Sequence, residues 1–354
     1  MPSISSIALF STLVSSTLCA TTYDMVKGVR WLNVFQRLGF LWFLRQPHQR
    51  GRHLRYLERG QILPVGLRGP DDEPCYYQVD NTSTVPLNQK RNTVRISSKD
   101  EFEVGSVWIA DMYHVPFGCS VWPAFWSQAP DWPTGGEIDT FEHWNMELNN
   151  QMTLHTDPGC NQVSPAQTSN VINSTDCSYA DNSNAGCGVM DPNPSSYGER
   201  FAQAGGGVFV TEFAEAGISV WFFNRSSIPS SLSGNASSFT TDALGTPTAN
   251  WPTGGCDIDT FFKAQNLIFD ITLCGDAAGE TSVFAQTCSG TCYNDYVVGN
   301  GSVYNNAYFD VASVRVYSVT GTNTTAINSA MPASRWTVTS MLALGGAVSL
   351  LLVL

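Results

Sequence analysis

Short runs in which apolar and polar residues alternate fill this chain from Val79 onward, separated by Gly, Pro, Asn and Ser. Alternation with a period of two places every second side chain on one face of a β-strand. No stretch before the C-terminal tail combines helical periodicity with helix caps. The sequence therefore predicts an all-β fold, an antiparallel β-sandwich formed by residues 79–320 and any strands that precede them. The clearest predicted strands are Thr93–Ser97, Ser106–Tyr113, Val208–Phe213, Ile218–Phe223, Leu267–Leu273 and Tyr308–Val319.

The charge of the chain narrows the class of ligand. Lys and Arg number 18 against 30 Asp and Glu, which gives a net charge of −12. Such a surface repels the phosphates of nucleic acids. Neutral or basic ligands are therefore expected.

One stretch, Gly135 to Glu142 (GGEIDTFE), places three carboxylates among apolar residues. Burying an unpaired carboxylate is costly, so we expect a functional reason. On a regular strand Glu137 and Asp139 share a face, whereas Glu142 points away. A β-bulge between Asp139 and Glu142 would turn all three toward one face, and bulges re-aim side chains at active sites.

Three carboxyl groups on one face suit glycoside hydrolysis. One carboxylate attacks the anomeric carbon, and a second carboxyl group protonates the leaving oxygen. Asp139, between them, would help one Glu to stay ionised and the other protonated. A Ca²⁺ site is the alternative, but such sites usually lie on loops with Asp, Asn and Gly spacing. We therefore expect Glu137, Asp139 and Glu142 to be catalytic, with no metal and no other cofactor.

Aromatic residues surround the acids. Trp122, Trp126, Trp132 and Trp144 offer flat faces on which a sugar ring can stack. Trp126 and Trp132 have polar neighbours and are expected to be exposed, whereas Trp122 and Trp144 could instead pack inside the sandwich. His155, on the expected next strand, faces either the carboxylates or the core.

In these residues the chain resembles glycoside hydrolase family 16, in its fungal laminarinase-like branch of endo-1,3(4)-β-glucanases. The family signature E-x-D-x-x-E stands here at Glu137, Asp139 and Glu142. The resemblance covers about residues 79–319. Its further phrases are RNTVRI at 91–96, WPAFW at 122–126, TLHT at 153–156, GCG at 186–188 and DVASVRVY at 310–317.

The resemblance implies a β-jelly-roll sandwich with a concave substrate cleft and a retaining mechanism. Glu137 would be the nucleophile, Glu142 the acid/base and Asp139 an assisting acid. It also places four residues beside the donor sugar: Arg91, Trp126, Trp132 and His155. Trp122 is a fifth candidate for binding the substrate.

The resemblance further implies a monomeric endo-β-glucanase that hydrolyses 1,3- or mixed 1,3/1,4-β-glucans. Two alternatives stay open: a cell-wall β-glucan transglycosylase with the same acids, and a non-catalytic carbohydrate-binding wall protein. One departure bears on the substrate, because the phrase CGDAAG at 274–279 has Ala277 where the branch has Trp. One stacking wall of the cleft is therefore expected to be missing.

Cysteines and glycosylation motifs indicate an extracellular chain. Residues 1–20 have an apolar stretch ending in small residues, typical of a signal peptide. Removing Cys19 and Cys75 leaves an even set of eight that we expect to form four disulfides: Cys119, Cys160, Cys177, Cys187, Cys256, Cys274, Cys288 and Cys292. Six N-x-S/T motifs are candidate glycosylation sites: Asn81, Asn173, Asn224, Asn235, Asn300 and Asn323.

The C-terminus resembles a GPI-attachment signal. Residues 321–340 form a spacer rich in Ser, Thr and Asn, and residues 341–354 (MLALGGAVSLLLVL) form a hydrophobic tail without charged residues. Fourteen residues in a helix are shorter than a bilayer core of about 30 Å. We therefore expect a secreted or cell-surface protein that contacts the membrane only through a GPI anchor.

The segment from Asp24 to Gln78 differs from the rest of the chain, because it holds nine of the 18 basic residues. A basic arm for an acidic partner is one interpretation. Codons for RQPHQRGRHLRY at 45–56 can instead be chosen so that a neighbouring frame reads DNLTNGDAIYV, a turn followed by a strand-like end. Our hypothesis is a reading-frame or splicing error over about residues 28–77, within an N-terminal part of the catalytic domain at 21–78. No strand is predicted between Asp24 and Gln78.

Overall fold

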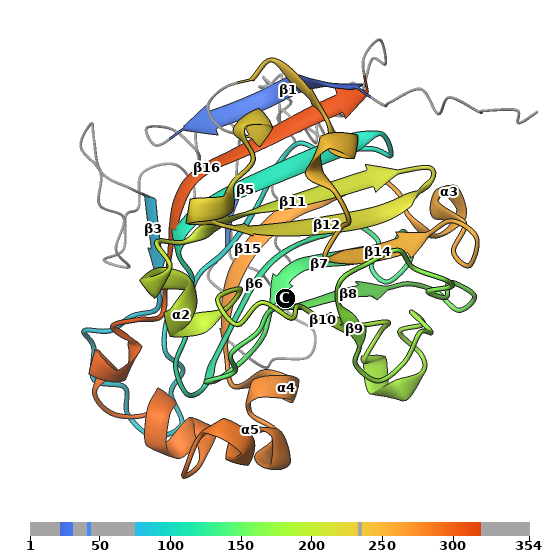
Figure 1. Cartoon of the computed structure of the whole chain (residues 1–354). Helices are drawn as coiled ribbons and strands as arrows, with labels where there is room; N and C mark the ends of the chain where they lie inside the picture. Colours follow the sequence, from blue (N-terminus) through green and yellow to red (C-terminus); the bar gives the residue numbers. More distant parts are fainter. Residues whose placement is uncertain (1–21, 31–40, 44–74, 233–235, 320–354) are drawn as a thin grey trace, which may run out of the picture.

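The computed structural model describes residues 22–30, 41–43, 75–232 and 236–319, and they form two antiparallel β-sheets packed face to face (Figure 1). Sheet A has the order β13-β1-β16-β5-β11-β12-β14, and β3 also pairs with β16. Its strands are β1 (Thr22–Arg30), β3 (Cys75–Gln78), β5 (Ser106–His114), β11 (Gly207–Ala214), β12 (Gly217–Asn224), β13 (Ser238–Thr240), β14 (Ala249–Pro252) and β16 (Tyr308–Val319).

Sheet B has the order β2-β4-β15-β6-β7-β8-β10-β9 and carries the three acids on β7. Its strands are β2 (Leu41–Phe43), β4 (Arg95–Ser97), β6 (Val121–Gln128), β7 (Glu137–Glu142), β8 (Gln151–His155), β9 (Asn170–Val171), β10 (Val189–Met190) and β15 (Asn266–Leu273). The α-helices are short: α2 (Gly198–Gln203), α3 (Ile258–Phe261), α4 (Gly275–Ala278) and α5 (Thr281–Thr287). None of the described helices is long and apolar enough to cross a membrane.

The core lies between the sheets and is rich in aromatic residues. Phe125 and Phe269, on neighbouring strands of sheet B, stack with ring centroids 4.4 Å apart. Phe141 meets Phe209 of sheet A at 5.5 Å, edge to face. Because alternate residues of each strand fill this core, the other face of sheet B is left for polar residues.

The predicted all-β sandwich is confirmed, and each of the six clearest predicted strands corresponds to an observed one (β4, β5, β11, β12, β15 and β16). The short α-helices were not predicted. The longest of them has seven residues, too few for an amphipathic period to show in the sequence.

The expectation of no strands between Asp24 and Gln78 is wrong. Strand β1 pairs with β16, β3 extends the pairing of β16, and β2 pairs with β4 at the edge of sheet B. Tyr23 is buried, and its hydroxyl donates to Glu212 at 2.7 Å. The strands were missed because the segment was judged by its basic composition, and charge content says little about backbone pairing.

The frame-error hypothesis stays a prediction, since residues 44–74 lie outside the described residues. We expect the transcript to encode RQPHQRGRHLRY only where the reading frame is shifted or an intron is retained. Sequencing of the transcript across codons 24–78 tests this. A continuous frame, in a chain that folds and cleaves glucan, would refute the hypothesis.

The predicted disulfide set is confirmed. The eight cysteines form Cys119–Cys288, Cys160–Cys256, Cys177–Cys187 and Cys274–Cys292. The first closes 169 residues of chain, so it ties the loop before β6 to the segment after α5. Cross-links of this kind typically contribute about 2 to 4 kcal/mol each.

The glycosylation motifs remain predictions. Asn173 and Asn300 are exposed, and Asn81 and Asn224 are half-buried. Asn235 and Asn323 lie outside the described residues, as do the signal-like residues 1–20, the spacer at 321–340 and the tail at 341–354.

Candidate active site

Strand β7 begins at a glycine turn and carries the predicted bulge. Gly136 has φ +75°, and a Cβ there would lie 2.3 Å from the Phe262 ring, so only glycine fits. The register of β7 against β8 shifts between Asp139 and Glu142, which confirms the bulge. Thr140 and Phe141 both face the core, and Glu142 therefore returns to the face that carries Glu137 and Asp139.

Asn150 satisfies backbone groups at the bulge. Its side-chain Nδ2 donates to the Thr140 carbonyl at 3.0 Å, and its Oδ1 accepts from the Glu142 backbone N–H at 2.9 Å. Asn150 is fully buried. One amide side chain thus holds both sides of the bulge and fixes where Glu142 projects.

We expect Asn150→Ala to destabilise the fold by about 1 to 3 kcal/mol for each of the two buried groups that lose a partner. The same change should lower kcat on glucan, because Glu142 is no longer held. Denaturant unfolding and kinetics on the soluble fraction measure both effects. Asn170→Ala, at an exposed position of β9, is the control and should change neither. A wild-type kcat in the Asn150→Ala variant would show that Asn150 is not needed to position Glu142.

The three carboxyl groups share a face of sheet B and all bind protons more tightly than usual. Burial, followed by the charge of Asp139, raises the pKa of Glu137 well above its usual value. Burial and the charge of Glu142 raise the pKa of Asp139 well above its usual value. Burial also raises the pKa of Glu142, to about 7, with added contributions from the charges of Glu137 and Asp270. Glu137 and Asp139 are hydrogen-bonded to each other, so one proton can be shared between them.

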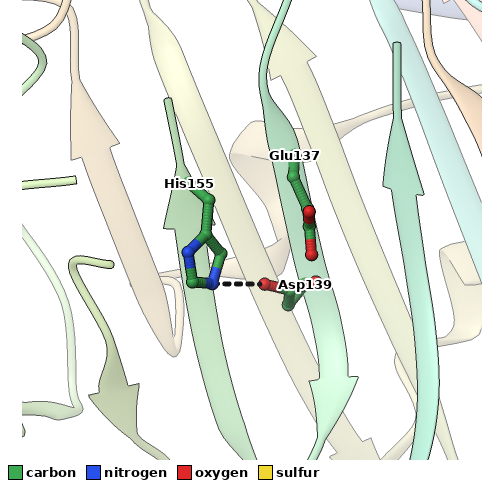
Figure 2. Close-up of side chains that lie close together, drawn as sticks. All are labelled: Glu137, Asp139 and His155. Carbon is green, nitrogen blue, oxygen red and sulfur yellow. Dashed lines mark ion pairs between the residues drawn. The ribbon is translucent and has the colours of Figure 1, made fainter. Parts of the chain in front are cut away.

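His155 faces Asp139 from the neighbouring strand (Figure 2). Its Nε2 lies 3.3 Å from Asp139 Oδ2, and its Nδ1 lies 3.0 Å from Asn184 Oδ1. An amide oxygen can only accept, so Nδ1 donates to Asn184, and Nε2 is directed at the acid. Asn184 belongs to the loop closed by the Cys177–Cys187 disulfide. His155 is thus placed at the site, as predicted.

Two tryptophans hold the outer acids by their indole N–H groups. Trp122 Nε1 donates to Glu142 Oε1 at 2.6 Å, and Trp132 Nε1 donates to Glu137 Oε2. Trp122 is half-buried and meets Trp144 edge to face at 6.1 Å, so it belongs to the site rather than to the core. Trp132, as expected, is exposed, and it meets Tyr179 edge to face at 6.0 Å.

Trp126 lies on the same face, in register with Asp139. Its Nε1 donates to Asp270 Oδ1 at 3.3 Å, and the Arg95 guanidinium lies 4.7 Å from the centre of its ring. Arg95 also approaches Asp270 at 3.9 Å. A cation therefore covers part of the indole surface and leaves less of it for a sugar.

The placement of Arg91 beside the donor sugar is wrong. Arg91 is 1% exposed, and its guanidinium donates to the backbone carbonyls of Asp80, Ser83, Val297 and Gly299. It joins the segment at 80–83 to the segment at 297–299 and so has a structural role. Arg95, four residues later, is the arginine that reaches the face with the acids.

Other site residues were also missed. Asp270 could have been found, because it is a charged residue inside the apolar strand sequence LIFDI at 267–271. Asn150 and Asn184 carry no such signal, since each acts through a contact with a distant part of the chain.

The effect of Ala277 on the site also remains a prediction. It lies on α4, and Gly275 of that helix packs against the Trp122 ring. The position that would carry the missing tryptophan is therefore near the end of the site that holds Glu142.

Glu137, Asp139 and His155 are also a set that could hold a metal ion, each offering one ligand atom within 4.8 Å of the others. The same carboxyl and imidazole groups already contact one another in the structure. We therefore assign no metal to them.

A β-sandwich with two glutamates and an aspartate turned to one face by a bulge, bounded by tryptophans, defines the class of β-sandwich glycoside hydrolases. A family model described as the XgeA-like catalytic domain of glycoside hydrolase family 16 matches residues 65–317. The chain belongs to this family. The predicted family and jelly-roll fold are thus confirmed, and the chain is a glycoside hydrolase.

Curated relatives and solved structures agree. A probable glycosidase of Schizosaccharomyces pombe is 37% identical over 84% of this chain and 70% of its own length. A probable endo-1,3(4)-β-glucanase of Neosartorya fischeri is 40% identical over 68% of this chain, which spans only 38% of that relative.

Two solved structures also match. The laminarinase 16A of Phanerochaete chrysosporium, solved with β-glucans in its donor and acceptor sites, has a TM-score of 0.75 and 36% identity, covering 84% of this chain and 99% of that one. An elongating family 16 β-1,3-glucosyltransferase has a TM-score of 0.68 and 31% identity, covering 84% of this chain and 100% of that one.

Proposed function

We propose that the chain is a retaining endo-β-glucanase that hydrolyses 1,3- or mixed 1,3/1,4-β-glucans through a covalent glycosyl-enzyme intermediate. The observation that carries the proposal is the bulge, which turns Glu137, Asp139 and Glu142 to one open face of sheet B. The names of the relatives support the choice of glucan.

The first step forms the bond between enzyme and sugar. Glu137 attacks the anomeric carbon as a carboxylate, after the proton that it shares with Asp139 has moved to Asp139, whose carboxyl group faces His155 Nε2. Glu142 gives its proton to the leaving oxygen, so the C–O bond breaks without releasing an alkoxide. Trp122 holds Glu142 in place through its indole N–H.

The second step releases the sugar. Glu142, now a carboxylate, takes a proton from water, and the resulting hydroxide attacks the anomeric carbon and frees Glu137. The anomeric configuration is inverted twice and is therefore retained.

The test is product analysis on laminarin, barley β-glucan and a galactan. We expect short oligosaccharides from the β-glucans and none from the galactan. Release of galactose oligomers, or no products from either glucan, would overturn the proposal.

Transglycosylation is a second candidate, and the similarity to the glucosyltransferase favours it. The chemistry differs only in whether water or a sugar hydroxyl attacks the intermediate. Added acceptor sugars separate the two, because a transglycosylase yields products longer than the substrate while a hydrolase yields shorter ones.

The pKa of Glu142 sets a pH dependence. Burial raises this pKa to about 7, and the acid role needs the protonated form, so kcat/KM on glucan should fall as the pH rises through about 7. An aryl glycoside with a dinitrophenol leaving group needs no proton and should not show this fall. A decline on glucan that begins near pH 4 to 5, where an ordinary glutamate ionises, would contradict the assignment.

Secretion is also proposed. Four disulfides among the described residues support an oxidising compartment. Attachment through a GPI anchor at the cell wall or surface rests on the sequence of the tail, and detection of a lipid-linked C-terminal peptide would test it.

A further inference from the structure

A fourth carboxylate lies on the face of sheet B that carries the acids. The strand β15 places Leu267, Phe269, Ile271 and Leu273 in the core between the sheets. Since side chains alternate along a strand, Asp270 points to the opposite face. It is only 7% exposed. A charge so poorly solvated acts on its neighbours with little screening.

The strand register places Asp270 and Glu142 on either side of Ala124, on the two strands that flank β6. Asp270 pairs with Ala124 of β6, and Ala124 pairs with Glu142 of β7. Cross-strand partners lie side by side on the same face, at about 4.5 to 5.5 Å between Cα atoms. The residue between them in the register is Ala124, whose side chain is a single methyl group.

We propose that Asp270 is a positioning residue for the catalytic proton: its negative charge, held across Ala124, keeps the proton on Glu142 until a glycosidic oxygen takes it. This deepens the proposed function and rests on it. The charge of Asp270 raises the pKa of Glu142 and that of Asp139, which agrees with this role.

The charge of Asp270 is fixed in place by two contacts. Trp126 Nε1 donates to its Oδ1 at 3.3 Å, and Arg95 approaches its Oδ2 at 3.9 Å. Arg95 offsets part of the charge, so the effect on Glu142 is smaller than that of a lone carboxylate. The other groups that act on Glu142 are Glu137, Asp139, His155 and the Trp122 indole, and the phenol of Tyr197 also interacts with it.

The test is Asp270→Asn, which removes the charge and keeps an oxygen that can accept from Trp126. We expect the alkaline fall of kcat/KM on unactivated β-glucan to move to lower pH by roughly half a unit to one unit, as for a charge about 10 Å away. With the dinitrophenyl substrate no shift should appear, because that leaving group needs no proton. Asp259→Asn, an exposed aspartate on α3, is the matched control and should leave the profile unchanged.

The outcomes separate the two proposals. Absence of glucan hydrolysis by the wild type would refute the proposed function. A wild type that hydrolyses glucan, with an Asp270→Asn variant that has an unmoved pH profile or only a uniformly lower kcat, would overturn the role of Asp270. If Asp270→Asn does not fold, Asp270→Ser is measured in the same way, and ¹³C NMR titration of the Glu142 carboxyl in either variant gives the shift directly.

Discussion

Replacing Glu137 with Gln is expected to lower hydrolysis of natural β-glucan and of activated aryl β-glucosides alike, by several orders of magnitude. An amide is a poor nucleophile, so the covalent intermediate does not form whatever the leaving group. Single-turnover and steady-state rates on both substrates measure the loss.

The exposed Glu199→Gln on α2 is the control and should keep full activity. Azide should not restore activity with retained stereochemistry to a Glu137 variant, because it would attack the sugar directly and invert it. A retained β-azide product from the Glu137→Gln variant would assign the nucleophile to another residue.

Glu142→Ala should separate the two kinds of substrate. Its half-buried carboxyl is the group with a pKa raised to about 7, and in the proposed mechanism it protonates the departing oxygen. Loss of that proton should stop cleavage of glucan, whose leaving group is a poor one, and spare formation of the intermediate from a dinitrophenyl glycoside. Rapid release of dinitrophenol, followed by slow turnover, is the expected trace.

Azide provides the complementary result for Glu142→Ala. The anion needs no general base, so it should attack the intermediate, speed turnover and give a β-azide of retained configuration. Equal losses on activated and natural substrates would contradict the role of Glu142.

The acids and their bulge could be predicted because burying charged side chains in an apolar strand is energetically unfavourable, and the sequence shows both the charges and the strand. Three carboxylates in an apolar strand require a reason, and a spacing of five positions requires a bulge to align Glu142 with Glu137. The disulfide set followed from the parity of the cysteines, whereas its pairing required the structure, since parity does not say which ones meet.

The residues around the acids could not be assigned in this way. Arg91 and Arg95 both stand in RNTVRI, and only the structure shows that Arg91 binds backbone carbonyls while Arg95 reaches Trp126. Asn150 and Asn184 act through contacts that form only when the chain folds, so no local pattern marks them. The strands β1 and β3 were missed for the related reason that pairing with β16 is a long-range property.

The most direct test of the central claim is to trap the intermediate with a slow 2-fluoro glucan analogue and to map the labelled peptide by mass spectrometry. The account predicts one glycosyl adduct, on Glu137. An adduct on Glu142, or no adduct together with a first-formed product of inverted configuration, would contradict it.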